Sequence, residues 1–370
     1  MADRDLLRPE LRGLAPYNAG LSLEDIAARP GVTRVAKLGS NENLSGIPAS
    51  VQADLVAAAG NAYLYPDPSA RELALALSKD LHCAPDQILF GDGSEDLLNV
   101  LARALLRPGD EVITLYPSFP LHEDYAVMMG AQVTRIDLRG GQIDVEALVA
   151  AMARPARLVI FANPMNPAGL WLSPQEITRI LEAQHPDTVL CIDEAYVEYA
   201  IHAEYEPATS SLANHDKPLL ILRTFSKAWG LAGLRIGFGV TNCPPLKAGM
   251  DLVRTPFNVN SLAQAAALSA LEHAKEMEAA VSATLTERAR LADGLEKLGL
   301  SCLPSAGNFV FVDMGQDAAA LAEKLLDHGV IVKAWKQPGY QSFMRISVGL
   351  PEDTDQVLGA LGLLLSNTGS

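Results

Sequence analysis

Three strand-like runs of the sequence each lead into a polar side chain that could take part in chemistry. Lys227 follows LLILRTFS, Asp193 ends TVLCID, and Asn166 lies just beyond RLVIFAN. A lysine at a partly buried site loses its proton easily and can then attack an aldehyde as a nucleophile. A carboxylate such as that of Asp193 can keep a pyridinium nitrogen protonated. The amide of Asn166 and the phenol of Tyr196 can donate hydrogen bonds to a phenolic oxygen.

A second group of residues could bind a phosphate. The motif GDGSED follows the run QILF and places Gly93 and Ser94 at the start of a helix, where backbone N–H groups and the helix dipole favour an anion. Taken alone, the motif could also be a simple turn with Ser94 as the helix cap. Thr224, Ser226 and Arg235, all in TFSKAWGLAGLRIG, could contact the same anion. The third glycine of a dinucleotide fingerprint is missing, which disfavours a nicotinamide cofactor.

These residues come together if the apolar runs form one sheet. Seven short runs alternate with helix-like segments between Gly39 and about Val240, which predicts an α/β fold with a mostly parallel, doubly wound sheet covered by helices on both faces. Ligands of such sheets bind outside the carboxyl ends of the strands. Asp193 alone could be a solvated strand end and Lys227 alone a surface lysine, but their shared edge favours one site. The runs are QILF, EVITLY, AQVTRIDL, RLVIFAN, TVLCID, LLILRT and RIGFGV.

The chain length of 370 residues exceeds what one core usually holds, so two domains are expected. After about Cys243, an alanine-rich helical stretch from Ser261 to Leu298 precedes the strand-like runs GNFVFVDM, VIVKAW and FMRISVG and two more helices. This pattern suits a smaller α+β domain. We predict an N-terminal arm (1–38) that packs on the small domain or on a partner subunit, a large domain (39–245) and a small domain (246–370), with the long helix bridging them.

The composition excludes several classes of partner. A formal net charge of −15 disfavours nucleic acid and anionic membranes, so an anionic substrate would need a local cluster of cations. The four cysteines have no paired spacing and no His–Cys ligand pattern, so no metal site is expected. The first residues lack the apolar core of a signal peptide and no apolar run approaches about 18 residues, so we predict a cytoplasmic location.

A lysine that can form a Schiff base, with an aspartate for a pyridinium nitrogen and a phosphate seat, is the signature of pyridoxal 5'-phosphate (PLP) chemistry. The sequence resembles the fold-type I PLP-dependent aminotransferases and, among them, the histidinol-phosphate aminotransferase family. The resemblance runs from residue 37 to residue 349 and rests on the order and spacing of SNEN, YPD, GDGSED, NPMNPAG, DEAYVEY, TFSKAWGLAGLRIG, GNFVFV and MRISVG. It implies a large PLP-binding lobe, a small C-terminal lobe and a homodimer with a shared active site.

The resemblance also implies a role for each matching residue. Lys227 would form the Schiff base with PLP and carry the proton between substrate and cofactor, and Asp193 would pair with the ring nitrogen of PLP. Tyr196 would be the third catalytic residue. Arg345 would grip the substrate carboxylate through a bidentate fork. The implied cofactor-binding residues are Tyr65 (lent across the dimer interface), Gly93, Ser94, Glu95, Phe119 (stacked on the ring), Asn166, Asp193, Tyr196, Thr224, Ser226, Lys227 and Arg235. The implied substrate-binding residues are Tyr17, Asn43, Lys333 and Arg345.

Three departures from the family pattern bear on the substrate. NPAG replaces the usual NPTG, Phe119 stands where tyrosine is common, and Lys333 replaces an arginine expected to face the phosphate of histidinol phosphate. Lysine keeps the charge but loses the fork. Trp335 and Tyr340 could shape an aromatic pocket or simply fill the core.

The expected reaction is ping-pong amino transfer from histidinol phosphate to 2-oxoglutarate, which gives imidazole acetol phosphate and glutamate. An aromatic amino-acid aminotransferase on the same scaffold is the second reading. A PLP-dependent decarboxylase of the threonine-phosphate type is a third. A DNA-binding regulator would need an appended module, for which the two domains leave no room.

Overall fold

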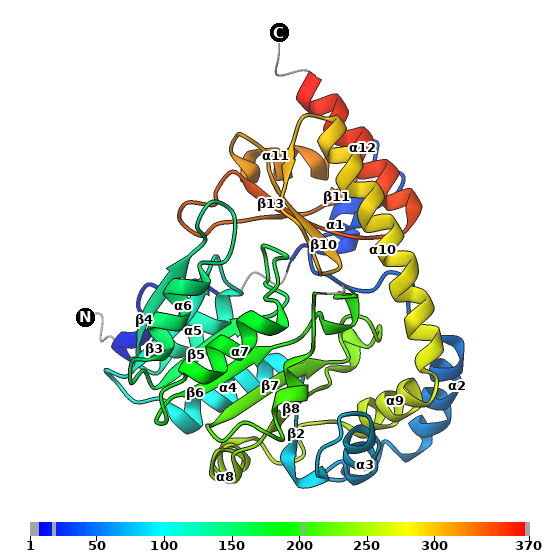
Figure 1. Ribbon diagram of the computed structural model, residues 1–370. Coiled ribbons are helices and arrows are strands. Elements are labelled where there is room, and N and C mark those ends of the chain that lie inside the picture. The colour runs from blue at the N-terminus through cyan, green and yellow to red at the C-terminus, as the bar shows by residue number, and fades with distance from the viewer. Residues whose placement is uncertain (1–6, 17–19, 202–203, 367–370) are drawn as a thin grey trace, which may run out of the picture.

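The computed structural model describes residues 7–16, 20–201 and 204–366, which form two lobes, each built around a β-sheet (Figure 1). The strands of the larger sheet are β2 (Ile88–Gly91), β3 (Glu111–Tyr116), β4 (Gln132–Asp137), β5 (Leu158–Ala162), β6 (Val189–Asp193), β7 (Leu219–Thr224) and β8 (Gly237–Thr241). They lie in the order β2-β8-β7-β6-β5-β3-β4. β8 is antiparallel to both of its neighbours, and the other neighbouring pairs are parallel. All seven predicted runs form strands, and the predicted α/β fold class is confirmed.

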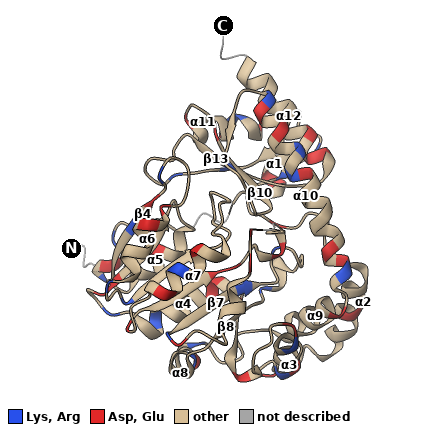
Figure 2. Cartoon of the chain, viewed as in Figure 1, with Lys and Arg blue, Asp and Glu red and all other residues tan. Residues whose placement is uncertain are grey.

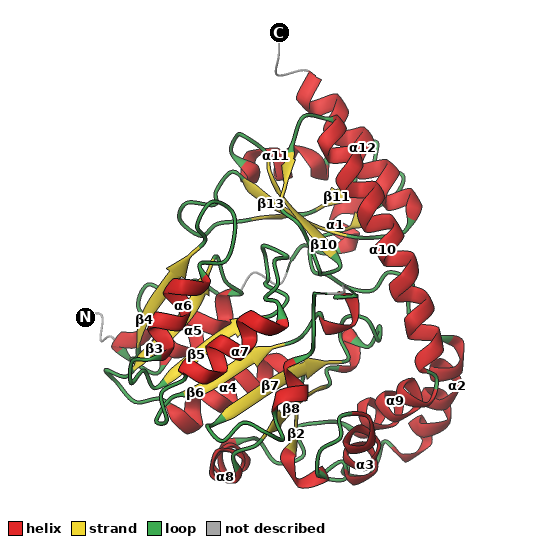
Figure 3. Cartoon of the chain, in the orientation of Figure 1, coloured by secondary structure: helices red, strands yellow, loops and turns green. Residues whose placement is uncertain are grey.

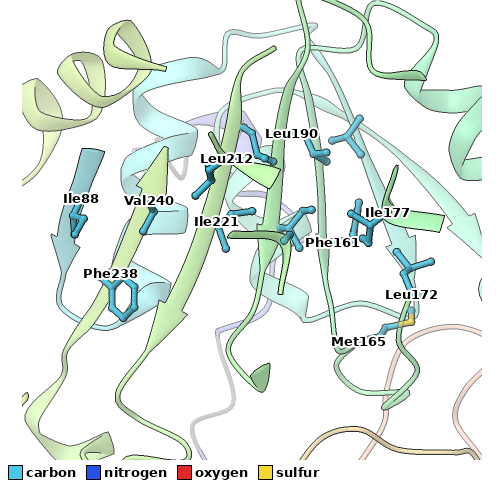
Figure 4. Close-up of a cluster of buried hydrophobic side chains, with 14 of the residues drawn as sticks. Ile88, Phe161, Met165, Leu172, Ile177, Leu190, Leu212, Ile221, Phe238 and Val240 are labelled. Carbon is cyan, nitrogen blue, oxygen red and sulfur yellow. The ribbon is translucent and has the colours of Figure 1, made fainter. Parts of the chain in front are cut away.

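Helices cover both faces of this sheet (Figure 3). The helices of this lobe are α2 (Ala49–Ala58), α3 (Arg71–Asp80), α4 (Ser94–Leu105), α5 (Pro120–Met128), α6 (Val145–Met152), α7 (Pro174–Ala183), α8 (Pro244–Val253) and α9 (Ser261–Glu272). Because side chains alternate along a strand, Ile160 and Leu220 face α4, α5 and α8, whereas their neighbours Phe161 and Ile221 face α6 and α7. Figure 4 shows buried apolar side chains of the cluster that contains Phe161 and Ile221, in which Ile177 of α7 lies near Phe161. The central strands β5, β6 and β7 are therefore apolar on both sides, as the sequence predicted, whereas the edge strand β4 exposes polar residues.

The smaller lobe is built on a four-stranded antiparallel sheet. Its strands β9 (Ser301–Cys302), β10 (Phe309–Asp313), β12 (Lys333–Ala334) and β13 (Phe343–Ser347) lie in the order β12-β13-β10-β9. The lobe also holds α1 (Leu23–Ala27), α10 (Ala274–Lys297), α11 (Ala318–Leu326), α12 (Pro351–Ser366) and the parallel pair β1 (Ala36–Lys37) and β11 (Val330–Ile331). Leu291, Val310, Ile346 and Leu361 are buried together in its core. Acidic and basic residues are interspersed on α10, whereas the charged residues of α12 are all acidic and lie near its start (Figure 2).

Two helix boundaries have a clear local cause. α7 begins at Pro174, where Ser173 and Glu176 form a reciprocal capping box. The expectation of one continuous helix from Ser261 to Leu298 is wrong, because His273 (φ −110°, ψ 32°) leaves the helical conformation and separates α9 from α10. Ala263 and the other small buried residues of α9 pack into the core of the large lobe, whereas α10 runs along the side of the molecule to the small sheet (Figure 1).

The predicted division of the chain between residues 245 and 246 stays a prediction. The core of the large sheet also takes in Leu246 and Met250 from α8 and Ala263 from α9, which this division assigned to the small domain. Within the described ranges, no helix is long and apolar enough to cross a membrane. The same residues hold no group of three or more His, Cys, Asp or Glu placed to bind a metal ion.

Candidate active site

A cavity of about 650 Å³ lies where the carboxyl ends of β5, β6 and β7 face the small lobe. The segment from Gly13 to Pro16 and the starts of α4 and α5 also line it, and β12 and β13 contribute side chains from the opposite lobe. The predicted site residues that line this cavity are Ser94, Glu95, Phe119, Asn166, Asp193, Tyr196, Thr224, Ser226, Lys227, Arg235, Lys333 and Arg345. The expected convergence at one sheet edge is therefore present.

Lys227 lies just beyond the end of β7, with its amine in the cavity. Its Nζ donates a hydrogen bond to the backbone oxygen of Ser40 at 3.0 Å. Burial, followed by the positive charge of Arg345, lowers the pKa of the Lys227 amine to about 8, while Glu42 and Asp193 act in the opposite direction. The neutral amine, which is the form that attacks a carbonyl group, is therefore accessible at mildly alkaline pH.

Asp193 ends β6, and its carboxylate is buried. Oδ1 accepts a hydrogen bond from the backbone N–H of Ala195 at 3.0 Å, and Oδ2 lies 3.2 Å from Nε2 of His122 on α5. An ionised carboxylate can only accept, so Nε2 of His122 carries the hydrogen of this contact. The sequence prediction missed His122, because a single histidine in a helix forms no pattern. Its spacing of about one helical turn from Phe119 was the one available signal.

Hydrogen bonds join Tyr196 and Asn166 of the large lobe to Arg345 of the small lobe. Nδ2 of Asn166 donates to the Tyr196 hydroxyl oxygen at 3.2 Å, and Oδ1 of Asn166 accepts from the Arg345 guanidinium at 2.7 Å. The guanidinium also donates to the backbone oxygen of Gly39 at 2.8 Å. A second amide, that of Asn41, donates to the Tyr196 hydroxyl at 2.9 Å. These buried polar contacts fix the side chains on both sides of the cavity relative to one another.

The turn between β2 and α4 forms a seat for an anion. Gly93 precedes α4 with φ +80° and ψ 165°, and Ser94, the first helical residue, does not cap the helix, so the alternative reading of Ser94 as a cap is wrong. The Arg235 guanidinium lies so close to Gly93 that a Cβ atom at this position would collide with it. The hydroxyls of Thr224 and Ser226 border the same cavity. An uncapped helix start beside a guanidinium and hydroxyl groups suits a phosphate.

Comparisons with known proteins place the chain in a family. The model of the family described as aminotransferase class I and II matches residues 33–361. Histidinol-phosphate aminotransferase 1 of Mesorhizobium japonicum is 47% identical over 362 residues, which are 98% of this chain and 99% of the relative. Histidinol-phosphate aminotransferase 3 of Rhizobium meliloti is 44% identical over 96% of each chain. The chain belongs to the class I and II aminotransferases, in the histidinol-phosphate aminotransferase family.

A solved structure agrees with this assignment. The crystal structure of histidinol-phosphate aminotransferase from Sinorhizobium meliloti in complex with PLP has a TM-score of 0.89 and 29% sequence identity, with complete coverage of both chains. The predicted resemblance is confirmed, and this chain is a PLP-dependent aminotransferase.

The cavity of this aminotransferase fits PLP by the chemistry of its side chains. Because Gly93 has no Cβ atom, the Arg235 guanidinium can lie against the start of α4. Asp193, held by His122 at a buried strand end, suits a pyridinium nitrogen. Lys227 supplies an amine with a lowered pKa. The role of each residue toward the cofactor stays a prediction, but phosphate-binding groups, a carboxylate and an amine border one cavity.

Some predicted site residues of the aminotransferase do not line this cavity. Asn43 donates from Nδ2 to the backbone oxygen of Ala228 at 2.9 Å, so it supports the main chain next to Lys227. Tyr65 is 82% exposed and stacks on Phe257 with ring centroids 4.6 Å apart, outside the cavity of its own chain.

The two aromatic residues considered for a substrate pocket differ in position. Trp335 lines the cavity, and its Nε1 donates to Oε1 of Gln337 at 2.8 Å. Tyr340 instead packs against Phe343 with a centroid distance of 5.4 Å and contributes to the core. Tyr17, which was predicted to bind substrate, lies outside the described residues.

Proposed function

We propose that this aminotransferase transfers the amino group of histidinol phosphate to 2-oxoglutarate by a ping-pong mechanism. The names of the relatives at 47% and 44% identity support this substrate. The amino donor is a small anionic molecule, and its phosphate has to be held by cations of a chain whose net charge is −15. A local cluster of cations in the cavity is therefore the observation that carries the proposal.

That cluster lies on the small-lobe side of the cavity. Lys333 on β12 is the register partner of Arg345 on β13, and Lys336 lines the cavity beside them. Burial, followed by the positive charges of Arg345 and Lys336, lowers the pKa of the Lys333 amine to about 8. A bound dianion would offset this repulsion and restore the charged form of Lys333. Histidinol phosphate carries a phosphate ester where an amino acid carries a carboxylate, so it gains more from these cations.

The residues of this chain would act as follows. PLP, when bound, supplies an electron sink that stabilises negative charge at the substrate α-carbon. Lys227 would remove the proton from the α-carbon and return it at the neighbouring cofactor carbon. Asp193 would hold the proton on the ring nitrogen, and Tyr196 would donate a hydrogen bond to the phenolic oxygen. Arg345 would orient the anionic group of each substrate in turn, the phosphate of one and the carboxylate of the other.

Steady-state kinetics with two donors test the proposal. Histidinol phosphate should be used with a much higher kcat/KM than phenylalanine, and a negligible rate with histidinol phosphate would refute the choice of substrate. Lys333→Ala should raise KM for histidinol phosphate by about 10- to 150-fold, because a charged hydrogen bond contributes about 1.5–3 kcal/mol. The same variant should change KM for glutamate much less. Lys324→Ala, at an exposed lysine of α11, is the matched control.

An aromatic amino-acid aminotransferase stays the second candidate, because Trp335 lines the cavity and could contact an aromatic substrate. A higher kcat/KM for phenylalanine than for histidinol phosphate would favour it. The decarboxylase reading predicts release of carbon dioxide without a product that depends on 2-oxoglutarate. Measuring carbon dioxide in the same reactions would test this reading.

We also propose that the enzyme is a homodimer in which Tyr65 contacts the phosphate seat of the other subunit. Tyr65, Tyr63, Leu64 and Phe257 form a neighbouring set of exposed apolar side chains, with Tyr63 and Tyr65 each 82% exposed. A second subunit would remove this surface from water.

The four cysteines are free, which fits the proposed cytoplasmic location.

A further inference from the structure

Asn41 and Ser347 occupy a buried position behind Tyr196, and neither is among the predicted site residues. The backbone N–H of Asn41 donates to Oγ of Ser347 at 2.9 Å, and Oγ of Ser347 lies 2.7 Å from Oδ1 of Asn41. Nδ2 of Asn41 then contacts the Tyr196 hydroxyl at 2.9 Å. All three side chains are almost completely buried. Ser347 belongs to β13 of the small lobe, whereas Tyr196 follows β6 of the large lobe.

The chemistry of the partners determines which end of each amide faces Tyr196. Oγ of Ser347 accepts from the backbone N–H of Asn41, and its own buried hydrogen finds an acceptor on the Asn41 side chain 2.7 Å away, so the atom of Asn41 that faces Ser347 is the amide oxygen. Oδ1 of Asn166 faces the guanidinium of Arg345, which can only donate. Both amides therefore present their NH₂ groups to the hydroxyl oxygen of Tyr196.

This arrangement determines the direction of the phenolic hydrogen. A hydroxyl oxygen has two lone pairs, and the two amide donors at 2.9 and 3.2 Å use both of them. Tyr196 cannot donate to either amide, because each amide presents hydrogens to it. We propose that Asn41, oriented by Ser347, is a positioning residue that keeps the Tyr196 hydroxyl a hydrogen-bond donor toward the cavity. The inference rests on the proposed function, in which Tyr196 donates to the phenolic oxygen of PLP.

The backbone at Asn41 is compatible with this role. Its φ of +57° lies in the left-handed region, which asparagine and aspartate tolerate better than other side chains with a Cβ atom. Nδ2 of Asn308 additionally donates to the backbone oxygen of Asn41 at 3.0 Å, so the segment is held independently of the side-chain amide. Asn41→Asp should consequently fold, and it replaces the NH₂ group facing Tyr196 with an oxygen that can accept the phenolic hydrogen.

The test is a pH titration of the visible absorbance of the holoenzyme, with PLP affinity and thermal midpoint of the apoenzyme as separate readouts. The deprotonated form of the cofactor carries the most negative charge on its phenolic oxygen, and a hydrogen bond to that oxygen stabilises this form. Loss of the hydrogen bond should therefore raise the pH at the midpoint of the absorbance titration. Tyr196→Phe should raise it by about one to two pH units. Asn41→Asp should also raise this pH midpoint, and the increase should be about one pH unit larger when residue 196 is tyrosine than when it is phenylalanine. With Tyr196→Phe, only the added charge of the aspartate acts.

Neutral variants separate orientation from structural support. Ser347→Ala frees the Asn41 amide to turn its oxygen toward Tyr196, so it should raise the midpoint in the Tyr196 background and leave it unchanged with Tyr196→Phe. Asn308→Ala removes a hydrogen bond from the same segment and should lower the thermal midpoint without moving the absorbance titration. Equal effects of the Asn41 and Ser347 variants in both backgrounds would overturn the inference while the role of Tyr196 stands. An unshifted Tyr196→Phe would overturn both.

Discussion

Gly93 offers the sharpest test of the phosphate seat, because two properties of this position disfavour a side chain. Its backbone has φ +80° and ψ 165°, a region that is essentially restricted to glycine and costs other residues about 1–3 kcal/mol. A Cβ atom there would also collide with the guanidinium of Arg235. Gly93→Ala should therefore strain the turn and move Arg235 away from the start of α4.

The two effects should appear in different measurements. Backbone strain lowers the free energy of unfolding of the apoenzyme by about 1–3 kcal/mol, which urea denaturation followed by circular dichroism would measure. Displacement of Arg235 removes a charged hydrogen bond to the phosphate, worth about 1.5–3 kcal/mol, so the Kd for PLP should rise about 10- to 150-fold. Fluorescence titration of the apoenzyme with PLP would measure this increase.

Gly249→Ala is the matched control, because Gly249 lies inside α8 with open space where a Cβ atom would be added. This change should stabilise the helix by about 1 kcal/mol and leave the Kd for PLP unaltered. If Gly93→Ala binds PLP as tightly as the unchanged enzyme, the assignment of Arg235 and the start of α4 to the phosphate is wrong. A similar loss of affinity for pyridoxal, which has no phosphate, would refute it equally.

Two further predictions concern the lysine and the dimer. Reductive methylation of Lys227 in the apoenzyme, followed by mass spectrometry, should have a midpoint near pH 8, because burial and Arg345 lower the pKa of this amine. Arg345→Gln should move the midpoint to higher pH. A midpoint near the ordinary pKa of lysine would contradict this prediction. Lys227→Ala and Tyr65→Ala should each be nearly inactive alone, but mixed and refolded subunits should regain about a quarter of full activity, because half of the dimers then hold one complete site. No recovery would exclude a site shared through Tyr65.

The sheet and the chemistry at its edge could be predicted from sequence because both follow from short-range patterns. The seven apolar runs are long enough to identify strands, and the rule for carboxyl ends then places Asp193, Lys227 and Asn166 together. The break at His273 could not be predicted in the same way. Its cause is that α9 packs in the core of the large lobe while α10 reaches the small sheet, and helix propensity contains no information about this difference.

The SNEN motif shows why the remaining part of the site needed coordinates. It contains two asparagines, and the prediction chose Asn43 to meet the substrate, yet Asn43 supports the main chain at Ala228 and Asn41 reaches Tyr196. Nothing in the local sequence distinguishes the two, because the groups that accept from their Nδ2 atoms lie more than 150 positions away. His122 was missed for the same reason, since only the fold brings it to Asp193. Strand ends determine which groups reach the cavity, but the direction of each hydrogen depends on such distant partners. The donor role proposed for Tyr196 therefore depends on contacts between the two lobes.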